Sequence, residues 1–423
     1  GDHRDLHSFP THALPIFVNA SSFALTGLSL QSSAAVSAGT ESVTLDSQSS
    51  IDASSLPAGG PFVWGTTTVT VLLSKAQSIT LKTSRVLGTN ASTTFIALVG
   101  GAVRDTAGNG VQAIASSSAL GARLYAADTT FASLAGATLD MDQAVLTLTF
   151  NDVVDASTLK ARAITIQSSA QSVSGKVYTL TTSSTSSSDG YEIAVTLSRA
   201  DILGLHLVSG LATSSSNAYI VMQASVLNDM LGRNVLAVTD GRGVQAQFVA
   251  DATPPTLVGV RLNMTSEQLL LSFSEPVLSS SVDLSAVTIQ DGATYTVGRT
   301  LTGGNWTMLA SHETVAIDLL TADLNSLKIH DQAVATSTAN TYIVLTSSFV
   351  TDFTNNAVVA VGDGSARQAD DFGSDTVAPE LASFVVDMDA RRLTLSFSEV
   401  VRAASVAVSA GIVVQNAATS NTA

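Results

Sequence analysis

The stretch LTLSFSE, from Leu393 to Glu399, has two earlier relatives in the chain: LTLTFND at Leu146–Asp152 and LLLSFSE at Leu269–Glu275. In each copy, aliphatic residues at the first and third positions and a phenylalanine at the fifth alternate with Thr, Ser or Leu. Alternation with a period of two predicts a β-strand that buries one face. The phenylalanines lie at 150, 273 and 397, so the steps are 273 − 150 = 123 and 397 − 273 = 124 residues. A period this constant predicts tandem domains.

Length and composition agree with several β-rich domains. A chain of 423 residues is long enough for roughly three domains. Only 13% of the residues are charged, and the net charge of −15 makes nucleic acid or an anionic membrane surface an unfavourable partner. The chain has no cysteine, which excludes disulfides, zinc–thiolate sites and thiol catalysis. No apolar run approaches the ~20 residues of a membrane helix, so we expect no membrane insertion.

The repeat divides the chain into four parts, called here the first (1–127), second (128–250), third (251–374) and fourth (375–423) repeats. The segment Phe17–Ser33 of the first repeat matches Val153–Ser169 of the second, but the strands that should precede it are missing. The fourth repeat supplies those opening strands and stops after the strand that ends at Gln415. We therefore expect an incomplete first domain and a partial fourth repeat.

Each complete repeat is predicted to be an all-β sandwich of about 123 residues with one short helical turn. The helix signals are LSRADILGL from Leu197 and LTADLNSLK from Leu320. Ser198 or Thr321 is the expected N-terminal cap, with Asp201 three residues after Ser198 and Asp323 two residues after Thr321, near the position that a capping box uses for Glu.

The mismatched ends predict how the chain is used. An incomplete sandwich exposes an unpaired strand edge and an apolar cleft, which favours pairing with another chain. Strand addition by the tail, about Asp375 to Val401, would complete the first repeat of a neighbouring copy, and a head-to-tail contact that does not close builds a fibre. The alternative is that the sequence is a window of a longer multi-repeat chain. The side chains expected to be donated are Phe384, Val386, Leu393, Leu395 and Phe397.

The third repeat resembles known surface proteins. The order of a DxTPP linker, FSEPV and a V-x-D-x-x-x-N turn looks like the Ig-like domains of bacterial surface layers. The fuller pattern is similar to tandem repeats of algal and protist surface proteins, including flagellar hairs (mastigonemes). These motifs are DATPP from Asp251, FSEPV from Phe273, LTGG from Leu301, LTADLN from Leu320, ATSTANTY from Ala335 and VTDFTNNAV from Val350. The resemblance implies tandem Ig-like domains with an extracellular structural or adhesive role, without catalysis.

Three functional interpretations follow. The first is a structural subunit of an extracellular filament or surface appendage, assembled from copies of itself. The second is a monomeric adhesin stalk or binding module, and the third is a non-catalytic spacer of a larger secreted protein. No nucleophile elbow, phosphate-binding loop or zinc-protease motif occurs in a suitable context, so we expect no enzyme activity.

The sequence also predicts modification and metal sites. N-glycosylation sequons occur at Asn19, Asn90, Asn263 and Asn305. No cofactor is expected, although acidic residues near the domain junctions could bind calcium, which needs six to eight oxygen ligands. These acids are Asp229, Asp251, Glu275, Asp352, Asp375 and Glu399. The N-terminal amine with His3 could hold copper or nickel if Gly1 is a true N-terminus.

Overall fold

A computed structural model describes residues 18–19, 22–52, 68–105, 107–174, 176–329, 333–402, 405 and 412–415. Short β-strands dominate the described part, which confirms the all-β class. The α-helices within it are α1 (Lys75–Thr83), α2 (Arg199–Leu207) and α3 (Thr321–Lys328), one for each of the first three repeats. In the described ranges no helix combines the length and hydropathy needed to cross a membrane.

The chain forms two compact units. Unit 1 consists of Gly1–Asp140, Ala144–Ser198 and Val208–Val249, and unit 2 consists of Met141–Gln143, Arg199–Leu207 and Ala250–Ala423. Helix α2 therefore belongs to the second repeat by sequence and to unit 2 by its packing. The repeats of the sequence and the compact units of the structure therefore do not have the same boundaries.

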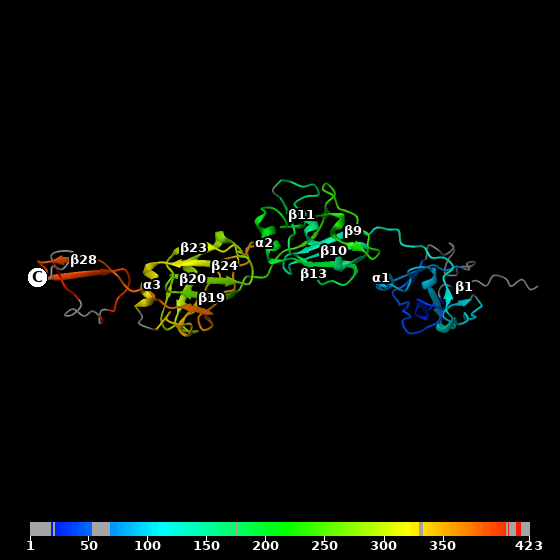
Figure 1. The fold of residues 1–423 in the computed structure, drawn as a ribbon, viewed down its shortest axis with the longest axis horizontal. Helices are drawn as coiled ribbons and strands as arrows, with labels where there is room; N and C mark the ends of the chain where they lie inside the picture. Colours follow the sequence, from blue (N-terminus) through cyan, green and yellow to red (C-terminus); the bar gives the residue numbers. More distant parts are fainter. Residues whose placement is uncertain are drawn as a thin grey trace, which may run out of the picture. The chain divides into compact units, whose positions relative to one another are not determined.

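The third repeat shows the complete arrangement, with two sheets around one core (Figure 1). The first sheet has the order β23 (Gly304–Met308), β24 (Thr314–Leu319), β20 (Gln268–Phe273), β19 (Leu257–Asn263) and β27 (Asp371–Gly373). The second has the order β22 (Gly298–Thr300), β21 (Val287–Gln290), β25 (Tyr342–Leu345) and β26 (Arg367–Gln368). In β20, Leu269 and Leu271 are 0% exposed and Phe273 is 2% exposed, so the alternation predicted from the sequence is confirmed.

The second repeat has the same strand order. Its first sheet runs β13 (Ser184–Thr185), β14 (Gly190–Thr196), β10 (Val145–Asp155), β9 (Leu134–Asp140) and β18 (Gln247–Val249), with β16 (Asn228–Asp229) on the end of β10. Its second sheet runs β12 (Val177–Thr179), β11 (Ile164–Gln167), β15 (Tyr219–Met222) and β17 (Val244–Gln245). In both repeats the last strand of the first sheet, β18 or β27, pairs in parallel with β9 or β19. Those two strands pair antiparallel with β10 and β20 on their other side.

The described part of the first repeat has only one sheet of full width. This sheet runs β3 (Ser42–Thr44), β2 (Leu28–Gln31), β6 (Phe95–Leu98) and β8 (Leu120–Gly121), and it corresponds to the second sheet of the later repeats. Two small pairs accompany it: β1 (Val18–Asn19) with β7 (Arg104–Asp105), and β4 (Ser50–Ile51) with β5 (Val71–Leu72). β1 corresponds to the end of β10, and among the described residues of the first repeat no strand corresponds to β9 or to the earlier part of β10.

The fourth repeat contributes a hairpin of β28 (Leu381–Asp387) and β29 (Arg392–Phe397). Its register repeats that of β9–β10 and β19–β20, including the irregularity near the open end of the pair. Within the described residues the hairpin is a two-stranded sheet with no further strand on either edge. A strand pair without a full counterpart among the described residues of the first repeat is thus present here, and the described residues contain no other strand of its sheet.

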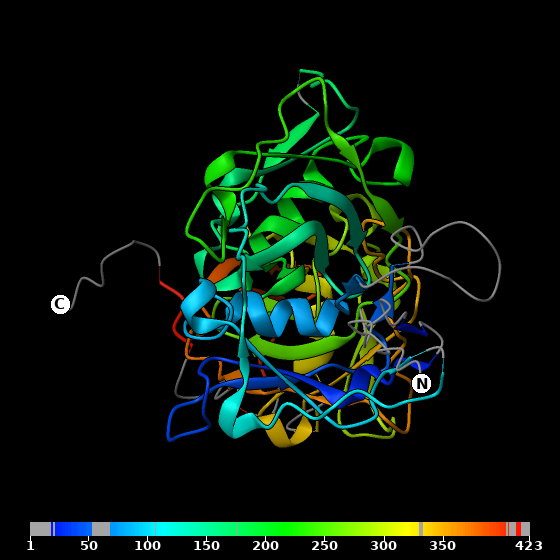
Figure 2. The same ribbon diagram turned by 90° about the vertical axis from the view of Figure 1, so that its right-hand side faces the viewer.

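The helices begin for different reasons. Helix α1, light blue in Figures 1 and 2, begins after Ser74, whose hydroxyl accepts a hydrogen bond from the backbone N–H of Gln77. The prediction that Thr321 caps α3 is wrong, because Thr321 is the first helical residue and Leu320 holds the cap position without a side-chain bond. Asp323 is fully buried and accepts a hydrogen bond from Nε of Arg299 on β22 instead of closing a capping box. This tertiary ion pair overrides the local capping signal.

Candidate functional site

A lysine at the end of α1 joins two carboxylates in unit 1. The Nζ atom of Lys82 lies 2.8 Å from Oδ2 of Asp128 and 2.5 Å from Oδ1 of Asp152. Asp128 precedes the first strands of the second repeat, and Asp152 follows the predicted FSE-type strand. Burial acts to lower the pKa of Lys82, but the bonds and charges of the two carboxylates outweigh it and raise the pKa.

Unit 2 contains the same arrangement two periods further along the chain, in the third repeat. At the end of α3, Nζ of Lys328 lies 2.7 Å from Oδ2 of Asp375 and 2.6 Å from Oε2 of Glu399. The pKa of Lys328 is also raised, since its two carboxylate partners outweigh the effect of burial. We call each of these groups a lysine clamp: one helix-terminal lysine bound to the acid of a linker and to the acid after an FSE-type strand.

Helix α2 has a histidine where the other two helices have the lysine. His206 follows Leu205 as Lys82 follows Leu81 and as Lys328 follows Leu327. The His206 ring stacks on Phe353 with 4.9 Å between the ring centroids. Burial lowers the pKa of His206, with Asp352 acting in the opposite direction, so the imidazole is neutral at pH 7. The clamp position on α2 therefore carries no positive charge at this pH.

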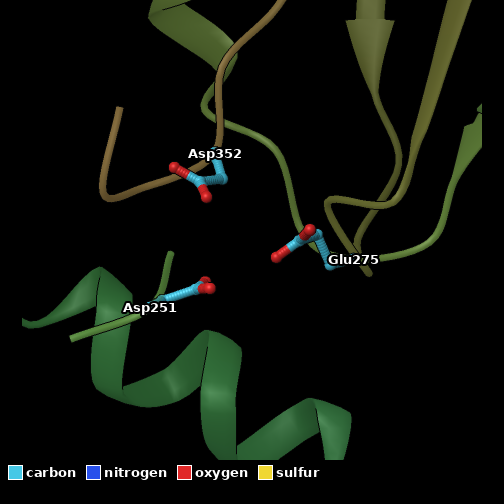
Figure 3. Close-up of side chains that lie close together, drawn as sticks. All are labelled: Asp251, Glu275 and Asp352. Carbon is cyan, nitrogen blue, oxygen red and sulfur yellow. The ribbon is translucent and has the colours of Figure 1, made fainter. Parts of the chain in front are cut away.

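The carboxylates of this third group gather without a lysine. Oxygens of Asp251, Glu275 and Asp352 lie within 4.8 Å of one another, and the three side chains point toward a common space (Figure 3). Asp251 and Glu275 are the counterparts of Asp375 and Glu399. We call these three residues the carboxylate cluster.

The cluster changes the ionisation of its members. Burial, followed by the charges of Asp251 and Asp352, raises the pKa of Glu275 to about 8. Burial is also the main reason that the pKa of Asp251 is raised. Asp142 adds a further negative charge nearby and accepts hydrogen bonds from the backbone N–H and the hydroxyl of its partners at 252 and 253. Near neutral pH, Glu275 thus holds a proton that an exposed glutamate has lost.

The structure separates the acids that the sequence grouped as calcium ligands. Asp375 and Glu399 bind Lys328, and Oδ2 of Asp229 lies 2.7 Å from Nε of Arg233. The carboxylate cluster keeps the ligand chemistry that calcium prefers, but three carboxylates supply fewer than the six to eight oxygens needed. Calcium binding stays a prediction, now restricted to Asp251, Glu275 and Asp352. The predicted metal ligands Gly1 and His3 lie outside the described residues.

The predicted glycosylation sites occupy different places. Asn90 is the exposed N-cap of a short turn, with Oδ1 accepting from the N–H of Ser92. Asn263 is the exposed last residue of β19, and Asn305 is exposed on the edge strand β23. The side chain of Asn19 lies outside the described residues. Exposure at three sequons permits modification, and glycosylation stays a prediction.

The predicted assembly residues lie on the β28–β29 hairpin. Phe384 is 59% exposed, Val386 is 46% exposed and Leu393 is 39% exposed, whereas Leu395 and Phe397 are partly buried. The counterparts of these five side chains in the two complete repeats are at most 7% exposed: Ala137, Leu139, Leu146, Leu148 and Phe150, and Val260, Leu262, Leu269, Leu271 and Phe273. The hairpin therefore presents a core face that has no core to pack against among the described residues.

Comparison with known proteins identifies no family. No family model matches the chain, and no curated protein matches it. Solved structures of the surface layer protein SbsC are similar to part of it. Domains 1–6 of SbsC match with a TM-score of 0.19 and 14% identity over 34% of this chain and 18% of that one. A second SbsC structure matches with a TM-score of 0.19 and 13% identity over the same shares. Similarity at this level carries no conclusion about function.

Proposed function

We propose that this chain is a structural subunit of an extracellular filament or surface appendage, whose copies join head to tail by sharing β-strands. In this proposal the hairpin of one copy completes the first repeat of the next. The second and third repeats form closed sandwiches and act as spacers between joints. The role is mechanical and non-catalytic, and glycans on the exposed sequons are compatible with a location at the cell surface.

One observation carries the proposal: core-type side chains are exposed on both sides of the expected joint. On the hairpin, Phe384 and Val386 are about half exposed, while their counterparts in the third repeat, Val260 and Leu262, are at most 1% exposed. On the first repeat, Leu73 is 40% exposed, while its counterparts Leu197 and Leu319 are 4% and 6% exposed. Joining the two surfaces would return each side chain to the environment that its counterparts have.

The energetics favour such a joint. Full burial of one Val, Leu or Phe side chain contributes about 1.5 to 3 kcal/mol relative to an exposed one. Several such side chains, together with the hydrogen bonds of new strand pairs, can exceed the 4 to 15 kcal/mol that association costs in lost freedom of motion. The net charge of −15 opposes unspecific clumping of the finished assembly.

Removal of the fourth repeat tests the proposal. We expect the full chain to form linear assemblies in electron microscopy and to sediment faster as its concentration rises. A variant without residues 375–423 is expected to stay monomeric under the same conditions, because its donor hairpin is gone. A control that ends after Arg402 keeps the hairpin and is expected to assemble. Monodisperse particles from all three chains would contradict the proposal and would indicate a monomeric stalk.

A further inference from the structure

We infer that β29 of one copy pairs with β5 of a second copy, in a register that places Leu393 opposite Val71. This inference rests on the proposed function and specifies its contact: which strands meet, in which direction and residue by residue. The second and third repeats provide the template, since each contains the complete sheet that the joint would restore.

The first repeat has a strand edge in the place where the template puts the hairpin. In the second repeat β14 lies between β13 and β10, and in the third repeat β24 lies between β23 and β20. In the first repeat β5 has β4 on the side that corresponds to β13 and β23. On its other side no strand pairs with β5 among the described residues. That side is where β10 and β20 lie in the complete repeats.

The side chains along this edge match a buried row. Val69, Val71 and Leu73 are every second residue of the extended segment that leads into α1, so their side chains share one face, and each is at least partly exposed. The counterparts in the second repeat, Ile193 and Val195, are both 0% exposed. Those in the third repeat, Val315, Ile317 and Leu319, are at most 6% exposed. The acceptor edge is therefore an apolar row. In the two complete repeats, which contain the counterparts of β28 and β29, the corresponding row is buried.

Both complete repeats give the same antiparallel register. In the second, Leu146 pairs with Val195 and Leu148 pairs with Ile193. In the third, the corresponding pairs are Leu269 with Ile317 and Leu271 with Val315. Transfer of this register to the joint gives Leu393 with Val71, Thr394 with Thr70, and Leu395 with Val69. A shift by one residue would turn every apolar side chain of β29 away from the core, so the register is strongly specified.

The free edge of β28 would also gain a neighbouring strand in the joint. In the complete repeats a short strand that follows β17 or β26 pairs in parallel with β9 or β19. The segment directly after β8 is the counterpart of this strand in chain order, and Leu124 within it is 85% exposed. The completed sheet would have the order β4, β5, β29, β28 and the segment after β8, with β28 and β29 from the other copy.

The occupant that we infer is a second copy, because the hairpin of each chain is held on its own third repeat. The described residues of the second and third repeats form two sheets in each repeat. The start and the end of the hairpin are also tied to α3, since Lys328 binds both Asp375 and Glu399. A donor held on its own third repeat is suited to insertion into another molecule.

Disulfide cross-linking tests the register, and the absence of cysteine from the sequence removes any background. A doubly substituted chain with Thr70→Cys and Thr394→Cys places one thiol on each side of the joint, both on the outer face. Oxidation followed by non-reducing gel electrophoresis is expected to give a ladder of linked chains. The control pairs Thr70→Cys with Arg392→Cys, which lies on the same face but two residues out of register, at a diagonal of about 7 to 8 Å. We expect at least a tenfold lower yield from the control.

The other outcomes are equally informative. A cross-linked monomer would show that the hairpin closes on its own chain, which overturns the second copy as occupant. Equal yields from both pairs, or no cross-link from an assembly that sedimentation still detects, would overturn the register while the proposed function stands. If the unsubstituted chain does not assemble at any concentration, the proposed function itself fails and this inference fails with it.

Discussion

Replacing Val386 by aspartate is expected to weaken assembly at least 100-fold while the single chain keeps its fold. Val386 is 46% exposed in the hairpin, so the substituted carboxylate stays in water before assembly. Its counterparts Leu139 and Leu262 are 0% and 1% exposed, so assembly would bury the charge without a partner. Burial of an unpaired carboxylate costs several kcal/mol, and about 3 kcal/mol already corresponds to more than a hundredfold change in affinity. Concentration-dependent sedimentation measures the effect.

The neighbouring residue gives a matched control. Val385 points to the opposite face of β28, and its counterpart in the third repeat is the exposed Arg261. Val385→Arg therefore introduces a charge on the same strand without burying it, and assembly should stay within a few-fold of the unsubstituted chain. A comparable loss from both substitutions would show that charge on the hairpin, and not burial of this face, controls assembly.

Replacing Glu275 by glutamine is expected to stabilise the protein at alkaline pH. The folded state raises the pKa of Glu275 from 4.5 to about 8, so between these values the folded protein binds more protons than the unfolded chain. Stability then falls as the pH rises through this window. Glu275 is only half-buried, so after a discount for solvent screening we expect Glu275→Gln to gain about 1 to 2 kcal/mol near pH 8.5, where the effect is complete, and little near the unfolded pKa of 4.5. Calorimetric melting at both pH values measures this difference.

The same chemical change in unit 1 should have the opposite sign. Asp152 corresponds to Glu275 but lies 2.5 Å from the Lys82 ammonium. Asp152→Asn removes a charge-assisted hydrogen bond and should cost about 1 to 2 kcal/mol at neutral pH. Lys82 has a raised pKa, so this contribution is fully present below the unfolded value of 10.5 and is lost as the pH rises through the folded value. Stabilisation by both amide substitutions would contradict the assigned charges.

Calcium can be tested in the same experiment. A calcium ion held by the carboxylate cluster would replace the missing lysine charge, so millimolar calcium chloride should raise the melting temperature of the unsubstituted chain near pH 8.5. Glu275→Gln removes a ligand and should reduce that rise. No response of the unsubstituted chain to calcium would remove the metal prediction and leave proton uptake as the way the cluster is neutralised.

The strands of the core could be predicted from the sequence because their signal is local and repeated. Phe150 and Phe273 mark strands whose alternate side chains are fully buried, as the two-residue period indicates. The segments Phe17–Ser33 and Val153–Ser169, which match in sequence, also pair in equivalent ways. Val18 pairs with Asp105 in β1–β7 as Val154 pairs with Asp229 in β10–β16.

The lysine clamps were missed because they depend on tertiary packing. Lys82 lies 70 residues from Asp152, and Lys328 lies 71 residues from Glu399, so no local pattern connects the partners. A signal was present nevertheless: alignment of the three helices places Lys82, His206 and Lys328 in one column. The histidine in that column marks the group of acids, the carboxylate cluster, that has no lysine partner at the end of its helix. The prediction that Thr321 caps α3 was wrong for the opposite reason. It rested on a local motif, whereas the buried ion pair of Asp323 with Arg299 determines the structure at this position.

A mixing experiment tests strand sharing most directly. Val386→Asp disables the donor hairpin, and Leu73→Asp, at a position 40% exposed in the single chain, disables the acceptor edge. Each variant alone keeps one working surface and should be monomeric in size-exclusion chromatography with light scattering. An equimolar mixture should form a dimer of one chain of each kind and nothing larger, because the two remaining surfaces are both disabled. A mixture that stays monomeric, or a single variant that still forms long assemblies, would contradict the exchange of β-strands between copies.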